Sequence, residues 1–126
     1  MSRSLVTLAV GLATAALAGA AISAYAAKPV IHSTLTLEHE QTQTGHIFSG
    51  RVESRRRKCE RNRTVGLYAT SGSQLVGKPV KTTRRGRWQV QLPGDFLAGS
   101  FYAKAKRKKT RRFRCGADRS NVITIP

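Results

Sequence analysis

The stretch GRWQVQLPGDFLAGSFYAKAK, residues 86–106, contains two short runs in which apolar and polar side chains alternate. Each run places three apolar residues on one face: Trp88, Val90 and Leu92 in the first, and Phe101, Ala103 and Ala105 in the second. The opposite face of the second run carries Tyr102, Lys104 and Lys106, which we expect to point outward. A period of two is typical of a β-strand with one buried face. The stretch therefore predicts two β-strands, separated by a turn rich in proline and glycine.

The same alternation recurs along the chain, interrupted by Gly, Pro, Asn, Ser or clusters of charge. Further runs occupy residues 33–40, 46–54, 64–70, 74–82 and 121–125. The run at 74–82 is the weakest, because its proline suits only an edge strand. Beyond residue 27, no segment has apolar residues at helical spacing over any length. Seven short strands in about 100 residues predict an all-β fold, a seven-stranded antiparallel β-sandwich of the immunoglobulin-like or transthyretin-like kind.

The first 27 residues differ in composition from the rest. Arg3 precedes an uncharged, mostly apolar stretch from Leu5 to Ile22, and small residues occupy positions 24 and 26. This layout predicts a helical secretory signal peptide at residues 1–27. The alternative is an uncleaved membrane anchor, which the many alanines and glycines disfavour. We therefore expect a secreted or extracellular protein, with membrane anchoring through the N-terminal segment as the alternative.

The chain beyond the signal peptide has the length of one domain. We assign residues 46–126 to the β-sandwich domain. Residues 28–45 form an N-terminal lead-in, which either supplies the first strand or is flexible.

Cys59 and Cys115 are the only cysteines. An even number of cysteines in an exported protein predicts a disulfide. This bond would close a long loop and stabilise the fold by about 4 kcal/mol. The alternatives are two free thiols or a metal site. Zinc requires about four ligands, and neither a further cysteine nor a nearby histidine is present.

Positive charge dominates the composition. The chain has 23 Lys and Arg residues against 6 Asp and Glu residues, a formal net charge of +17. Nineteen of the 22 basic residues beyond the signal peptide lie in three segments, 55–63, 81–87 and 104–119. Antiparallel strands alternate in direction, so these three connecting segments share one end of a sandwich. A bond between Cys59 and Cys115 requires the same arrangement, since bonded Cα atoms lie within about 7 Å. The sequence therefore predicts a dipolar molecule.

Several segments resemble small secreted bacterial β-sandwich domains of the transthyretin-like or carboxypeptidase-regulatory-like kind. They are FSGRVES (48–54), KCERNRTVGLY (58–68), GRWQVQLPG (86–94), GSFYAKAKRKK (99–109) and RCGADRSNVITI (114–125). In such modules a G-x-V strand leads to a basic loop with a cysteine, and later strands lead to a second cysteine. The resemblance implies a disulfide-linked sandwich without enzymatic activity.

The basic loops are the candidate binding site, because the planar guanidinium group pairs with phosphate, sulfate and carboxylate. The candidate polyanion-binding residues flank the two cysteines or lie in the middle segment: Arg55, Arg56, Arg57, Lys58, Arg61, Arg63, Arg84, Arg85, Lys106, Arg107, Lys108, Lys109, Arg111, Arg112 and Arg114. The expected partners are anionic polymers at or outside the cell surface: a wall polymer, an acidic polysaccharide or the backbone of a nucleic acid, without a specific nucleic-acid site. The alternative is a structural or solubility module of the cell envelope or extracellular space, with no dedicated ligand.

An enzyme is not expected. His32, His39 and His46 are seven residues apart, a spacing that alternates faces on a strand, so we expect exposed or strand-end histidines and no metal. Motifs for a nucleophile or a phosphate-binding loop are missing from the sequence. We also expect no cofactor. Stable membrane insertion after cleavage is not expected, because no apolar face accompanies the charge.

Overall fold

The computed structural model describes residues 28–94 and 97–126. The first of its two main sheets is centred on β4 (Gly45–Glu53), which pairs with β7 (Arg87–Pro93) along most of its length. On the other side β4 pairs with β2 (Thr34–Leu35) and β3 (Glu38–Gln41). All of these pairs are antiparallel. The lead-in therefore contributes strands to the sandwich.

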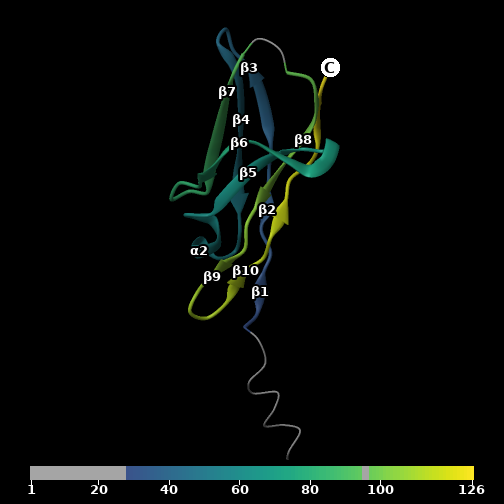
Figure 1. The fold of residues 1–126 in the computed structure, drawn as a ribbon. Coiled ribbons are helices and arrows are strands. Elements are labelled where there is room, and N and C mark those ends of the chain that lie inside the picture. The colour runs from purple at the N-terminus through teal and green to yellow at the C-terminus, as the bar shows by residue number, and fades with distance from the viewer. Residues whose placement is uncertain (1–27, 95–96) are drawn as a thin grey trace, which may run out of the picture.

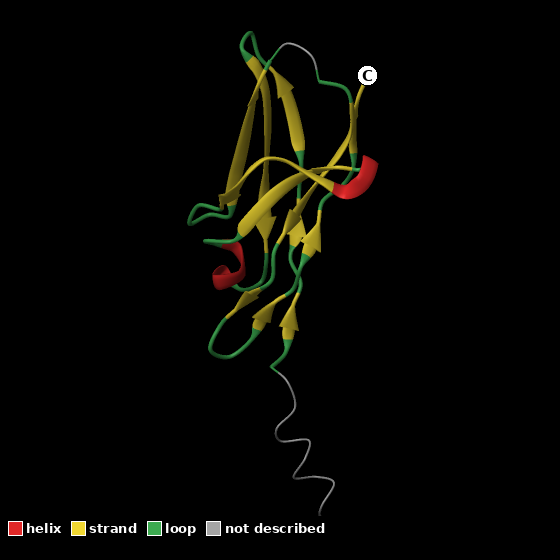
Figure 2. Cartoon of the chain, in the orientation of Figure 1, coloured by secondary structure: helices red, strands yellow, loops and turns green. Residues whose placement is uncertain are grey.

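The second sheet contains β5 (Thr64–Ala69) between β6 (Gln74–Lys81) and β8 (Gly99–Ala105). β11 (Asp118–Arg119) and β12 (Ile123–Ile125) pair with the free side of β8. Strands form most of the described chain (Figure 2). The prediction of an antiparallel β-sandwich with one disulfide is confirmed. The expected signal peptide, residues 1–27, lies outside the described residues.

A small third sheet extends the sandwich at one end. It consists of β1 (Val30–Ile31), β10 (Arg114–Cys115) and β9 (Lys108–Lys109), and β1 runs parallel to β10. The remaining elements are the helical turn α2 (Arg57–Glu60) and the 3-10 turn η2 (Ser71–Ser73). Strands of two residues are too short to show a period of two, so the alternation could not reveal them.

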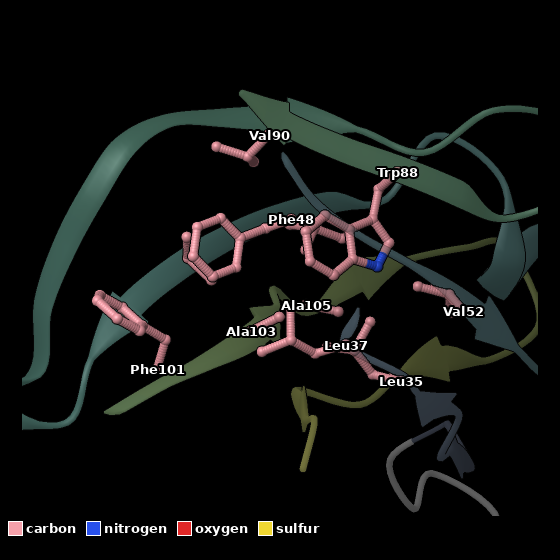
Figure 3. Packing of buried hydrophobic residues seen from close by; sticks show 11 residues of the cluster. Leu35, Leu37, Phe48, Val52, Trp88, Val90, Phe101, Ala103 and Ala105 are labelled. Carbon is pink, nitrogen blue, oxygen red and sulfur yellow. The ribbon is translucent and has the colours of Figure 1, made fainter. Parts of the chain in front are cut away.

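The core lies between the two main sheets (Figure 3). Phe48 from the first sheet and Phe101 from the second meet with ring centroids 5.5 Å apart. The predicted inward faces supply most of the cluster: Leu35, Leu37, Phe48, Val52, Val65, Leu67, Trp88, Val90, Phe101, Ala103 and Ala105. Burial of these side chains is the main source of stability for the sheets.

Tyr102 lies on the predicted outer face but is not exposed, since only 6% of the residue is accessible to solvent. Its ring stacks against Tyr68 with centroids 5.5 Å apart. The guanidinium carbon of Arg119 lies 3.9 Å from the centroid of the Tyr102 ring. The alternation assigns the correct face, but a neighbouring cation covers the ring there.

Candidate functional site: the basic end

The end of the sandwich that carries β1, α2, β9 and β10 lies opposite the C-terminus (Figure 1). We call this region, together with the turn between β6 and β7, the basic end. The candidate residues exposed on it are Arg55, Arg56, Arg57, Lys58, Arg61, Arg84, Arg85, Lys106, Arg107, Lys109, Arg111, Arg112 and Arg114. Thirteen of the fifteen candidate residues thus lie exposed on this part of the molecule.

The disulfide joins α2 to β10 at the centre of the basic end. The Cα atoms of Cys59 and Cys115 are 5.4 Å apart, and neither residue is accessible to solvent. Ile31 from β1 belongs to the same buried apolar cluster as the two cysteines. The predicted bond is therefore confirmed, and it ties the first basic segment to the third.

Arg63 requires a correction, because it is fully buried and was expected among the exposed binding residues. Its Nη1 donates to the carbonyl of Cys59 at 2.9 Å. Nε and Nη2 donate to the carbonyl of Lys106, and Nη2 also donates to the carbonyl of Gly116 at 2.8 Å. Arg63 therefore binds the backbone of the first basic segment (55–63) and of the third (104–119), and it is not available to a polymer.

A buried carboxylate faces this guanidinium. Oδ2 of Asp118 lies 3.9 Å from Nη2 of Arg63, and the same oxygen accepts the amide proton of Ser33. Burial lowers the pKa of Arg63, and the charge of Asp118 partly opposes that shift. The other oxygen, Oδ1, lies 3.0 Å from Nδ1 of His32, whose side chain is mostly exposed. Asp118 thus lies between the buried guanidinium of Arg63 and the exposed imidazole of His32.

Further contacts link the basic segments into one surface. Nζ of Lys108, the remaining candidate, donates to the carbonyls of Lys58 and Arg61 at 2.8 Å each. Burial and the neighbouring cations, Arg61 first among them, lower the pKa of Lys108. The guanidinium carbon of Arg56 lies 5.5 Å from the centroid of the Phe113 ring. α2 is therefore in contact with β9 and with the loop that precedes β10.

A cleft of about 660 Å³ opens where α2 faces the β6–β7 turn. Its lining residues come from β4, from α2 and its flank, and from the turn: Arg51, Arg57, Glu60, Arg61, Arg84 and Arg85. We call this feature the arginine cleft. Five guanidinium groups and one carboxylate give it a net formal charge of +4.

The turn that forms one wall of the arginine cleft is held by its backbone. The amide of Gly86 donates to the carbonyl of Thr83 at 3.0 Å, which closes a tight turn with Arg84 and Arg85 at its corner. Gly86 has φ +78°, and a Cβ there would lie 2.3 Å from the carbonyl oxygen of Val52. Only glycine fits this close approach to β4.

The opposite wall of the arginine cleft, formed by α2, is hydrogen-bonded to Thr82, which directly follows β6. The hydroxyl of Thr82 donates to the carbonyl of Glu60 at 2.6 Å and accepts the amide proton of Arg63 at 2.7 Å. Oε2 of Glu60 accepts the amide proton of Ser54. Together with the disulfide at Cys59, these bonds hold the backbone of α2 in place beside the turn.

Arg51 is a member of the arginine cleft that the sequence interpretation missed. Its Nε donates to the carbonyl of Arg85 at 3.1 Å, and its Nη1 lies 3.7 Å from Glu53. In the run at 46–54, the alternation places Arg51 only on the polar face of a strand. The signal that could have identified it is its position near the end of β4, close to the basic segment that follows.

The histidine prediction is wrong for one pair. Nε2 of His39 lies 2.8 Å from Nδ1 of His46, and the rings stack with centroids 5.1 Å apart. The two residues lie on β3 and β4, which form a hairpin, so spacing along a single strand does not apply. His46 is buried, and burial together with the charge of His46 lowers the pKa of His39.

Within residues 28–94 and 97–126, no three His, Cys, Asp or Glu side chains come close enough together to hold a metal ion. In the same part of the chain, no helix has the length and apolar character needed to cross a membrane.

The chain was compared with protein-family models, with curated proteins and with solved structures, and none of the three comparisons found a match. The resemblance to transthyretin-like or carboxypeptidase-regulatory-like modules therefore stays a prediction.

Proposed function

We propose that this protein is a secreted, non-catalytic domain that binds anionic polymers through its basic end. The observation that carries the proposal is the gathering of three basic segments, distant in sequence, on one exposed surface. Ten of the exposed cations there are arginines, whose guanidinium groups pair with phosphate, sulfate and carboxylate oxygens in two-point contacts.

The way in which this surface is held also supports the proposal. The disulfide, the buried guanidinium of Arg63 and the Gly86 turn fix the backbone that carries the cations. Less conformational freedom is then lost when a polymer binds. A polymer that neutralises many cations also releases counterions, which predicts an affinity that falls steeply with salt.

The test is the binding of the secreted, oxidised chain to duplex DNA, a sulfated glycan and an anionic wall polymer over a salt series. We expect binding near physiological salt and a linear fall of log affinity with log salt. A linear fall common to all three polymers would indicate recognition by charge alone. Binding that persists for one polymer where the others dissociate would identify the preferred class.

Two matched single variants distinguish binding by the basic end from attraction to net charge. Arg111→Gln removes one exposed cation from the basic end, whereas Lys78→Gln removes one exposed cation from β6, outside the basic end. We expect Arg111→Gln to reduce the salt slope and Lys78→Gln to leave it almost unchanged. Absence of binding to all three polymers would reject the proposal and favour a solubility or structural role.

A further inference from the structure

The arginine cleft differs from the rest of the basic end, because its cations converge on one space. β4, α2 and the β6–β7 turn each contribute guanidinium groups to the same 660 Å³. The other exposed candidate cations lie on α2 (Lys58), on loops and on short strands. Several cations around one cleft favour a compact anion over an extended chain of separate charges.

The cations of the arginine cleft have few partners in the protein. Arg51 donates to a carbonyl and approaches Glu53. In the described part of the chain, the guanidinium groups of Arg57, Arg61, Arg84 and Arg85 form no hydrogen bond or ion pair with the protein. Four arginines with free guanidinium donors therefore line a common cleft together with Glu60.

The chemistry of these donors selects among anions. A carboxylate offers two oxygens and one charge, and a sulfate ester also carries one charge. A terminal phosphate offers three strongly accepting oxygens and a charge of about −1.5 to −2 at neutral pH. Several planar forks can pair with such a group at once. The net charge of +4 also favours a ligand that brings more than one negative charge into the cleft.

We propose that the arginine cleft is a phosphoryl subsite that binds a phosphate group of about two negative charges, in the form of a phosphomonoester end or a pyrophosphate unit. This inference rests on the proposed function, since the subsite would hold one group of a polymer that the rest of the basic end contacts along its length. The carboxylate of Glu60 repels any anion that enters and therefore lowers the affinity of the site.

The first test is the titration of the secreted, oxidised chain with inorganic pyrophosphate, methyl sulfate and acetate at equal ionic strength, monitored by calorimetry. We expect pyrophosphate to bind one site per chain and the other two anions to bind much more weakly. The cleft pair Arg57→Gln/Arg84→Gln should weaken pyrophosphate binding on the order of tenfold or more, because it removes two charge-assisted contacts.

The matched control is Arg111→Gln/Arg112→Gln, which removes the same charge from the loop between β9 and β10. We expect only a small loss with this pair. Glu60→Gln should tighten pyrophosphate binding. Thermal unfolding of every variant checks that the fold is retained. Equal losses for the two arginine pairs, or equal binding of methyl sulfate and pyrophosphate, would overturn the phosphoryl subsite.

A second arm identifies the source of the phosphate and separates the two proposals. An oligonucleotide with a 5′-phosphate should bind more tightly than the same oligonucleotide with a 5′-hydroxyl, and the cleft pair should abolish the difference. Equal binding of both oligonucleotides, with binding to pyrophosphate absent, would reject the subsite and leave the proposed function standing. Pyrophosphate binding without any polymer binding would reject the proposed function.

Discussion

The apolar core and the basic end are stabilised by different interactions. Phe48 and Phe101 are buried between two sheets, and nearly the whole core cluster is hydrocarbon. The basic end has a small apolar group around Cys59 and Cys115, and its interior contains Arg63. The comparison indicates that a surface of repelling cations is held by a covalent bond and by hydrogen bonds to backbone carbonyls, where apolar burial is scarce.

The largest expected effect concerns the buried guanidinium. Arg63→Met leaves three carbonyls without their donor and Asp118 without its cation, so we expect a loss of about 3–5 kcal/mol in the free energy of unfolding. Urea denaturation measures this. The control Arg61→Met replaces an exposed cation and should change the free energy by less than about 0.5 kcal/mol. Equal losses in the free energy of unfolding for Arg63→Met and Arg61→Met would contradict this account of how the basic end is stabilised.

Loss of the disulfide comes next. Cys59→Ala/Cys115→Ala should lower the free energy of unfolding by about 2–4 kcal/mol, because the unfolded chain gains conformational freedom. Since the bond ties α2 to β10, the variant should also bind polyanions more weakly than the oxidised protein at the same salt. Denaturation and binding are measured on the same preparation. Unchanged affinity would show that the basic surface does not depend on the bond.

The turn beside the arginine cleft gives a smaller effect. Gly86 and Gly72 have similar positive φ values, +78° and +74°, but a Cβ at Gly72 meets only Gln74, at 3.8 Å. Both Gly→Ala variants incur backbone strain of about 1–3 kcal/mol. We expect Gly86→Ala to cost more, because its Cβ also displaces the turn from Val52. Equal melting temperatures of the two variants would argue against the close packing of this turn.

The smallest effect is a pH dependence at the other end of the molecule. The lowered pKa of His39 means that the unfolded chain binds its proton more readily than the folded chain does. Stability is therefore present above the unfolded pKa, near 6.5, and is lost as the pH falls towards the depressed folded value. His39→Gln should show less of this loss. Parallel stability curves for the two proteins between pH 7 and pH 5 would contradict the assignment.

The alternation of residues predicted the sandwich because its period of two reports directly on burial. All seven expected strands are present, although residues 33–40 are divided between β2 and β3. The disulfide followed from the count of cysteines and from the end that the two basic segments share. These features depend on the local pattern of residues and on the order of the strands, and both can be read from the sequence.

The identity of the buried cation could not be read in the same way. Arg63 is one of six bases in a short segment, and only the fold places the carbonyls of Cys59, Lys106 and Gly116 around it. The arginine cleft likewise depends on the packing of α2 against a turn more than twenty residues away. The His39–His46 contact depends on the hairpin between them. Each is a tertiary contact to which no local pattern corresponds.

The central claim is that the basic end, and not the net charge spread over the whole molecule, binds polyanions. The most direct measurement is an amide NMR titration of the oxidised protein with a short sulfated oligosaccharide at about 0.15 M salt. We predict shifts concentrated in residues 55–61, 83–87 and 106–116, with residues 42–44 of the β3–β4 turn unaffected. Shifts distributed evenly over both ends, or no shifts at all, would contradict the account.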